Sequence, residues 1–185
     1  PFLGKALEAA VIKQFDEHLN AYTETLLLKI HNDIMHSLDR GEIVMVILLD
    51  LSAAFDTIDH KILLNRLRNK YGMEGIALKC LKSYLQHRIQ SVMANNKESV
   101  KKELKFGVPQ GSKLGLFNAY IAPLSNVAEK NGVIDQEYAD DEQLILSFEP
   151  ESQTDAGNAV AKMEKCIDEI RIFLHENKLC NNSDR

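Results

Sequence analysis

Residue types that mark secreted, disordered or membrane-spanning proteins are scarce in this chain. Its 185 residues include four prolines, nine glycines and no tryptophan, and so little proline and glycine, without repetitive tracts, argues against extensive disorder. The sequence has no apolar run of about 18 residues, the length that a membrane-spanning helix requires. The three cysteines (Cys80, Cys166 and Cys180) are odd in number and lack the spacing of metal-binding pairs, so we expect no disulfide partner and no zinc framework. These absences and the chain length predict a globular chain, either one domain or one lobe of a larger enzyme, in an intracellular, reducing setting.

The charge of the chain is unevenly distributed. The 27 acidic residues outnumber the 22 basic ones, and the net charge of −5 by itself argues against a nucleic-acid partner. Between Lys61 and Lys105, however, there are eleven basic and three acidic residues, which gives +8 in this stretch and −13 in the remainder. This concentration predicts either a basic binding face or a set of ordinary solvated helix surfaces. Charge alone leaves these two alternatives open.

The spacing of apolar residues predicts a mixture of helices and strands. Apolar residues three to four apart predict amphipathic helices, whereas short apolar runs bounded by turn residues predict strands. We expect helices over about 7–19, 23–40, 59–72, 75–85 and 154–177, and one from about 116 that is disturbed at Pro123. We expect a buried central strand at Ile43–Leu49, two strands at 89–94 and 100–106, and a hairpin around 138–141. This order predicts an α+β fold, with an antiparallel sheet and helices packed on one face.

Three aspartates lie at the ends of predicted strands. Asp50 follows the apolar run Ile43–Leu49, and Asp140 and Asp141 form the tip of the predicted hairpin. If these strands are neighbours, the three carboxylates meet at one edge of the sheet and would suit Mg²⁺, a hard ion that prefers oxygen ligands. Two such ions can activate an attacking hydroxyl and stabilise the leaving oxygen of a phosphoryl transfer. The alternative is that Asp50 caps the following turn and the paired acids form a polar hairpin turn, and the residues alone leave both possibilities open.

Three stretches of the sequence resemble the motifs of one enzyme family. Leu48–Asp56 (LLDLSAAFD) is similar to motif A of reverse transcriptases, Gly107–Gly115 (GVPQGSKLG) to motif B, and Tyr138–Asp141 (YADD) to motif C, in the family's order. The wording Asp59-His60 and Lys82–Leu85 resembles the non-LTR (LINE-type) retrotransposon branch of that family. The likeness extends from about residue 23 to residue 179, and it implies a reverse-transcriptase palm with partial fingers.

The resemblance implies an RNA-directed DNA polymerase that adds dNTPs to the 3′ end of a DNA primer on an RNA template. Asp50, Asp140 and Asp141 would form the catalytic, metal-binding triad, and the backbone carbonyl of Leu51 would be a further metal ligand. The cofactor would be two Mg²⁺ ions, with Mn²⁺ as a possible substitute. The ring of Phe55 would leave no room for a 2′-hydroxyl and so favour dNTPs. The other residues that the resemblance implies are Gln110 and Gly111 for nucleotide binding, and Tyr138, Ser112, Lys101 and Lys102 for primer and template.

The resemblance also implies a division of the chain. Residues 1–42 and 60–106 would be fingers-like and residues 43–59 and 107–179 would form the palm, whereas a thumb and an endonuclease domain are absent from the sequence. The basic stretch would then contact the backbone of an RNA–DNA duplex, in a salt-dependent and sequence-independent way. A protein of this kind would work in the nucleus, the cytoplasm or both.

Three stretches depart from the family's pattern. Asn20–Tyr22 stands where the family has a longer segment with basic and aromatic residues. Leu114–Phe117 lacks a proline and is two residues short, which would rotate the apolar face of the following helix by roughly 200°. The end of the chain matches motif D loosely, with Arg185 in the place of a lysine, and arginine is a poor proton donor. These departures imply an alternative: a fragment with internal deletions, a catalytically inactive retrotransposon remnant that at most binds nucleic acid.

Overall fold

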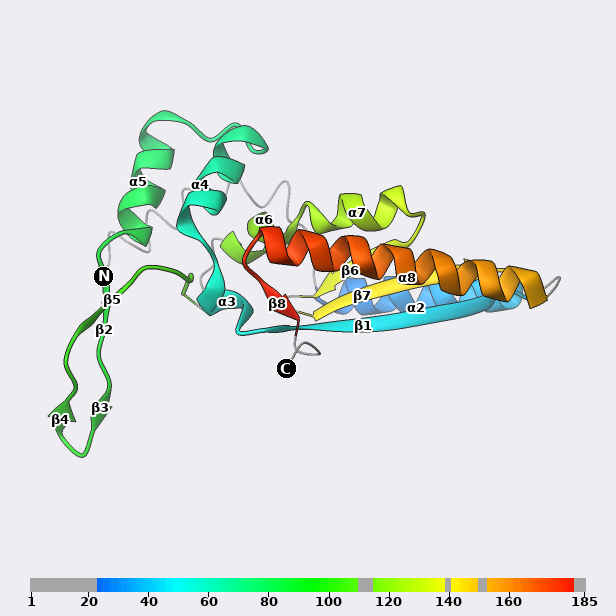
Figure 1. Cartoon of the computed structure of the whole chain (residues 1–185), viewed down its shortest axis with the longest axis horizontal. Helices are drawn as coiled ribbons and strands as arrows, with labels where there is room; N and C mark the ends of the chain where they lie inside the picture. Colours follow the sequence, from blue (N-terminus) through cyan, green and yellow to red (C-terminus); the bar gives the residue numbers. More distant parts are fainter. Residues whose placement is uncertain (1–22, 110–114, 139–140, 150–152, 182–185) are drawn as a thin grey trace. The chain divides into compact units, whose positions relative to one another are not determined.

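The computed structural model describes residues 23–109, 115–138, 141–149 and 153–181 (Figure 1). These residues fall into two compact units, of which Ala53–Tyr120 forms one and the described parts of His18–Ser52 and Ile121–Arg185 form the other. Each unit has its own buried apolar side chains, such as Leu63 in the first and Leu144 in the second. The fingers and palm ranges expected from the resemblance have other boundaries and stay a prediction. Within the described ranges, we find no helix with the length and apolar character needed to span a bilayer.

The unit that contains the predicted acidic hairpin is built on a four-stranded sheet. The strands are β6 (Ile134–Tyr138), β7 (Asp141–Phe148), β1 (Ile43–Ser52) and β8 (Cys180–Asn181), and they lie in the order β6-β7-β1-β8. Every neighbouring pair is antiparallel. The expected antiparallel sheet and the expected hairpin are therefore confirmed.

Two helices, α7 (Leu124–Lys130) and α8 (Gln153–Glu176), cover one face of this sheet. Helix α7 contacts α8 and β6, and α8 also contacts β7 and β8. The buried face of α8 repeats every three to four residues, as the 3.6-residue period of a helix requires. Its most deeply buried side chains are Met163, Cys166, Ile170 and Leu174.

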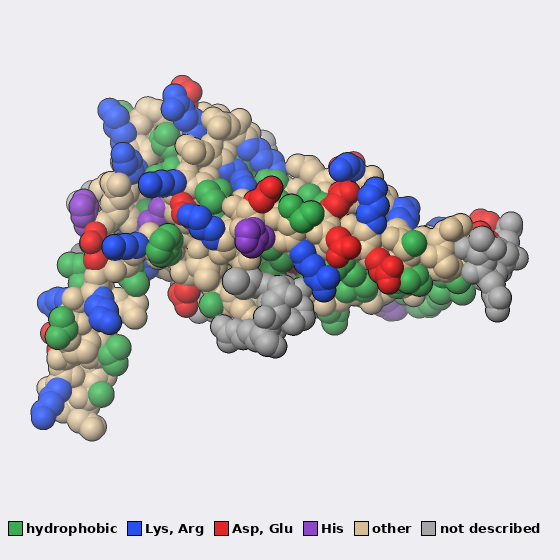
Figure 2. All heavy atoms as spheres, viewed as in Figure 1, with side chains coloured by type: hydrophobic (Ala, Val, Ile, Leu, Met, Phe, Trp, Pro, Cys, Tyr) green, Lys and Arg blue, Asp and Glu red, His purple; other side chains and the backbone are tan. Residues whose placement is uncertain are grey.

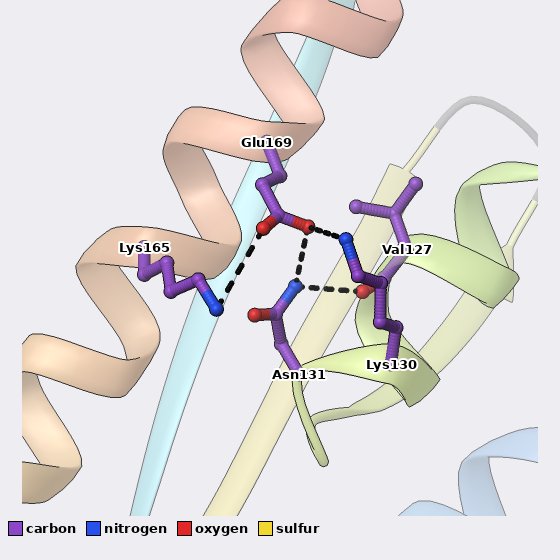
Figure 3. Close-up of polar contacts among 5 residues, drawn as sticks. All are labelled: Val127, Lys130, Asn131, Lys165 and Glu169. Carbon is purple, nitrogen blue, oxygen red and sulfur yellow. Dashed lines mark hydrogen bonds and ion pairs between the residues drawn. The ribbon is translucent and has the colours of Figure 1, made fainter.

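Glu169 joins the two covering helices at the end of α7 (Figure 3). One of its carboxylate oxygens accepts hydrogen bonds from Asn131 Nδ2 (2.9 Å) and Lys130 Nζ (3.3 Å), and the other lies 3.8 Å from Lys165 Nζ. Asn131 Nδ2 also donates to the carbonyl of Val127 at 2.9 Å. The hydrogen bond from Asn131, followed by the nearby ammonium groups, lowers the pKa of Glu169.

Strand β1 is central, as expected, but it is buried only near its end. Leu49 and Leu51 are 7% and 3% exposed, whereas Ile43, on the same face, is 46% exposed. Val46 and Leu48, on the opposite face, are 43% and 71% exposed. The prediction that the whole apolar run is buried was therefore wrong. A continuous apolar run shows that a strand can be buried on both faces, but it does not show which faces neighbouring elements cover.

Helix α2 (Thr23–Asp39) contacts β1 and β6 and lies behind the sheet in Figure 1. It ends at Asp39, and Gly41 closes the turn that follows, as expected, because the positive φ of +80° at this residue suits glycine. The turn is closed by Gly41 N–H to the carbonyl of Leu38 (2.9 Å) and by Glu42 N–H to that of Ser37 (3.0 Å). Arg40 Nε donates to the Glu42 carboxylate at 2.6 Å. This bond, with smaller contributions from the hydroxyls of Ser37 and Ser147, lowers the pKa of Glu42 to about 2.

The other unit begins with three helices, α3 (Ala54–Thr57), α4 (His60–Asn69) and α5 (Gly75–Leu85). The carboxylate of Asp59 accepts hydrogen bonds from the backbone N–H groups of Lys61 (2.8 Å) and Ile62 (3.2 Å), so the predicted N-cap is confirmed. Helix α6 (Leu116–Ile121) ends just before Pro123, and α7 starts after it, which confirms the predicted interruption. The expected rotation of the apolar face of α6 stays a prediction. The helix is buried almost all round, and its buried residues, each at most 2% exposed, are Leu116, Phe117, Ala119, Tyr120 and Ile121.

A two-stranded ribbon follows α5. Its strands are β2 (Arg88–Gln90) paired with β5 (Lys102–Leu104), and β3 (Met93–Ala94) paired with β4 (Lys97–Glu98). Asn95 and Asn96, both with positive φ, form the two-residue turn. Figure 2 shows Lys and Arg side chains gathered over α4 and α5. Nine of the eleven basic residues of the basic stretch are exposed: Lys61, Arg68, Lys70, Lys79, Lys82, Lys97, Lys101, Lys102 and Lys105.

Candidate functional site

Two of the three predicted catalytic positions are direct neighbours in the sheet. Asp50 on β1 is the register partner of Asp141 on β7, and directly opposite residues of an antiparallel pair have Cα atoms about 4.5–5.5 Å apart. Asp50 itself is exposed, between the buried side chains of Leu49 and Leu51. The expectation that these strands are neighbours is therefore confirmed.

The hairpin that carries Asp141 is closed by a two-residue link. Tyr138 at the end of β6 pairs with Asp141 at the start of β7, so residues 139 and 140 lie between them, outside the described residues. Among the residues that the structure does describe, no group of three or more His, Cys, Asp and Glu side chains could hold a metal ion. The donor set nevertheless suits a hard cation, because a carboxylate of Asp50 and the backbone of Leu51 supply oxygen ligands beside the Asp141 position.

A second pair of acids lies on the two strands of the hairpin. Glu142, the residue after Asp141, is fully buried, and Asp135 on β6 is half-buried. Burial raises the pKa of Asp135, and its hydrogen bonds with Glu142 and Ser125 offset part of that effect. Burial therefore favours the protonated form of the Asp135 carboxyl.

In the other unit, the turn at Gly107 is fastened to the turn that carries Phe55. Gly107 N–H donates to the carbonyl of Ile58 (2.9 Å), and Val108 N–H donates to the carbonyl of Phe55 (2.8 Å). A Cβ atom at Gly107 would lie 2.9 Å from the carbonyl oxygen of Asp56 and 3.0 Å from that of Phe55. Because the φ of Gly107 is +83° and these neighbours are backbone atoms, glycine permits an approach that no other residue allows without a shift.

Two side chains also hold the carbonyl oxygen of Gly107. His60 Nε2 lies 2.8 Å from it, and Arg88 Nη1 donates to it at 2.9 Å. A carbonyl oxygen can only accept, so His60 carries its proton on Nε2 in this contact. Both side chains are half-buried.

The aromatic ring of Phe55 rests on a second ring. Its centroid lies 4.8 Å from that of Phe117 on α6, with the ring planes inclined by 34°. Phe117 is 2% exposed, whereas Phe55 is half-buried. The tilted contact fixes one face of the Phe55 ring and leaves part of the ring accessible.

Comparison with known proteins identifies the family of the chain. Residues 1–183 match the family model described as "Reverse transcriptase (RNA-dependent DNA polymerase)". The chain belongs to the reverse transcriptase family. Its mixed helices and antiparallel sheet also match, with a TM-score of 0.60, the apo telomerase of Candida tropicalis truncated from its C-terminal domain, at 13% sequence identity over 98% of this chain and 39% of that one.

The curated relatives of this reverse transcriptase chain are polymerases of LINE-type elements. It is 30% identical over 121 residues to the probable RNA-directed DNA polymerase from transposon BS of Drosophila melanogaster, covering 62% of this chain and 13% of that protein. It is 29% identical over 163 residues to the RNA-directed DNA polymerase from mobile element jockey of Drosophila funebris, covering 76% of this chain and 18% of that protein. The chain therefore spans less than a fifth of the length of these relatives.

The structure of this reverse transcriptase chain describes some of the predicted site residues and omits others. Asp50, Leu51, Phe55, Lys101 and Lys102 are described. Lys101 lies 3.8 Å from the carboxylate of Glu98, and Lys102 is exposed opposite Gln90 in the ribbon. For Tyr138 and Asp141 the backbone pairing is described. Gln110, Gly111, Ser112, Asp140 and Arg185 lie outside the described residues, so their roles stay predictions.

Sequence reasoning missed three residues around Phe55. His60, Arg88 and Phe117 each contact the fastened turn or the Phe55 ring. His60 was noticed only as part of the Asp59-His60 wording and Arg88 only as a member of the basic stretch, because the residue they hold is 47 and 19 positions away in the sequence. Phe117 was noticed only as part of a shortened stretch, although a buried aromatic at a helix start could have suggested a packing partner.

Proposed function

We propose that this chain is the core of an RNA-directed DNA polymerase that extends a DNA primer on an RNA template. The observation that carries the proposal is the register of β1 and β7, in which Asp50 and Asp141 are direct partners next to the hairpin link. Adjacent carboxylates repel each other unless a cation or a proton lies between them. Family membership supplies the reason for expecting a cation.

Asp50, Asp140 and Asp141 would hold two Mg²⁺ ions, with the carbonyl of Leu51 as a further ligand. When bound, the ions supply charge neutralisation at the transferred phosphoryl group and a more acidic primer hydroxyl. The protein's own contribution is to fix the carboxylates on rigid strands. Leu49 and Leu51, buried on either side of Asp50, hold that position in the sheet and reduce its freedom to move.

Phe55, Gln110 and Gly111 would contact the incoming nucleotide. The half-buried Phe55 ring, supported from one side by Phe117, would exclude a ribose 2′-hydroxyl by its size, and the chain would therefore prefer dNTPs. Tyr138, Ser112, Lys101 and Lys102 would contact primer and template. The nine exposed basic residues support a nucleic-acid partner, because clustered lysine and arginine side chains attract a phosphate backbone.

Primer extension on poly(rA)/oligo(dT) with Mg²⁺ and dTTP tests this function. We expect Asp50→Asn to lower the rate by roughly 100-fold or more, because metal-ion charge stabilisation contributes several kcal/mol and each 1.4 kcal/mol corresponds to a factor of ten. Asp39→Asn is the matched control, since Asp39 is an exposed aspartate on α2, and it should extend at the wild-type rate. Extension that persists in Asp50→Asn would contradict the triad.

The same assay tests the alternative of an inactive remnant. A wild-type chain that binds the RNA–DNA duplex in a salt-dependent way, but does not extend the primer under any Mg²⁺ or Mn²⁺ concentration, would favour that alternative. The observations in its favour are the two shortened stretches of the sequence, Asn20–Tyr22 and Leu114–Phe117.

A further inference from the structure

The carbonyl oxygen of Gly107 has an unusual pair of hydrogen-bond partners. His60 is the first residue of α4 and Arg88 is the first residue of β2, and both reach the same backbone oxygen, at 2.8 and 2.9 Å. A carbonyl oxygen has two lone pairs, so these two donors saturate it. Two separate elements therefore meet at one atom, directly before Val108.

We propose that His60 and Arg88 are positioning residues of the nucleotide site, which together fix the Gly107 carbonyl and thereby Val108 and the Phe55 ring. The inference rests on the proposed function, because it assigns Phe55 to nucleotide binding. Neither side chain is expected to contact the substrate.

The connection to Phe55 is made through backbone atoms. The Gly107 and Val108 N–H groups donate to the carbonyls of Ile58 and Phe55 at 2.9 and 2.8 Å. The turn is thus held in two ways: its own N–H groups donate to two backbone carbonyls, and its Gly107 carbonyl accepts from two side chains. Loss of the side-chain donors should weaken the backbone pair and allow the Phe55 ring to move on Phe117.

The two donors differ in chemistry, which gives the test its conservative variants. Arg88 makes a charge-assisted hydrogen bond, and such bonds are roughly twice as strong as neutral ones. His60 donates from Nε2 as a ring N–H. The amide nitrogen of a glutamine can donate from a similar position, and a lysine keeps the charge of Arg88 with a single point donor.

The first measurement is amide hydrogen exchange of the whole chain by NMR, for Gly107 and Val108. The double variant His60→Ala/Arg88→Met should speed exchange at these two amides by about tenfold or more, since each lost hydrogen bond contributes on the order of 1 kcal/mol. The matched control is Lys29→Met/His31→Ala, which removes one basic side chain and one histidine from exposed positions on α2. His60→Gln should return most of the protection that His60→Ala loses. Unchanged exchange in the double variant would overturn the inference.

The second measurement separates positioning from mere stabilisation. In primer extension, the double variant should raise the KM for dTTP and lower the preference for dTTP over rUTP by about tenfold, while kcat and the affinity for the primer–template change less than threefold. His60→Ala alone should change the KM for dTTP and the preference for dTTP in the same direction by a smaller factor, and His60→Gln should leave both unchanged. Faster amide exchange with an unchanged KM and an unchanged preference would overturn the inference, because the residues would then only stabilise the fold.

A wild-type chain that does not polymerise would refute the proposed function without deciding this inference. In that case the dTTP dissociation constant, measured by NMR titration with Mg²⁺ and primer–template, replaces KM. An increase of about tenfold in the double variant, beside an unchanged control, supports the positioning role. Equal dissociation constants for the wild type and the double variant overturn it.

Discussion

Replacement of Gly107 by alanine tests how tightly the turn at Gly107 and Val108 is held. The new Cβ would lie 2.9 Å from the carbonyl oxygen of Asp56, 3.0 Å from the Cα of Asp56 and 3.0 Å from the carbonyl oxygen of Phe55. All three are backbone atoms, so the turn must move rather than a flexible side chain. An alanine with φ near +83° also costs about 1–2 kcal/mol of conformational strain.

Movement of the turn weakens the four hydrogen bonds made by Gly107 and Val108. If half of them are lost, at about 1 kcal/mol each, Gly107→Ala destabilises the chain by about 3–4 kcal/mol in total. The control is Gly72→Ala in the same unit, because Gly72 has a φ of +63° and its Cβ would meet nothing within 4 Å. This control carries only the strain of about 1–2 kcal/mol.

Urea unfolding followed by circular dichroism measures both free energies of unfolding, and primer extension gives the effect on dTTP KM. We expect Gly107→Ala to be less stable than Gly72→Ala by about 2 kcal/mol and to bind dTTP more weakly. Equal destabilisation by the two variants would refute the steric argument, since both residues share the positive φ and only Gly107 has close backbone neighbours.

Three further predictions concern the sheet unit. In urea unfolding, Leu144→Ala should lower the free energy of unfolding by about 2–5 kcal/mol and Leu48→Ala by less than about 1 kcal/mol. The reason is that Leu144 is fully buried and Leu48 is 71% exposed. Equal losses would contradict this difference in burial. Burial raises the pKa of Asp135, so the folded chain binds this proton more tightly than the unfolded chain and stability is lost as the pH rises through the folded pKa. Asp135→Asn should therefore gain stability relative to wild type as the pH rises above the usual range of an aspartate pKa, measured in thermal melts at a series of pH values, and a constant difference would contradict the assignment. The pKa of Glu42 is lowered to about 2 by Arg40 and two serines. The contribution of Glu42 to stability is therefore present above the unfolded pKa and disappears as the pH falls towards 2. The stability difference between wild type and Glu42→Gln should shrink over that range, and a difference that persists at pH 2 would exclude this ion pair as its source.

Local features were predictable because their causes lie within a few residues. Asp59 precedes an amphipathic stretch and caps α4, Gly41 closes the turn after α2, and Pro123 separates α6 from α7. The hairpin that carries Asp141 followed from two apolar arms around a short polar link. In each case the side chain or the backbone restriction acts on hydrogen bonds that the same segment makes.

The sequence by itself determined the antiparallel hairpin, the helix ends and, through its three motifs, membership of the reverse transcriptase family. Only the tertiary structure decided that Asp50 stands opposite Asp141 and that Leu48 remains exposed beside it. It also decided that His60 and Arg88 meet at one carbonyl oxygen. Register, face and donor convergence depend on which distant segments lie side by side, and the spacing of residues within one segment carries no information about that choice.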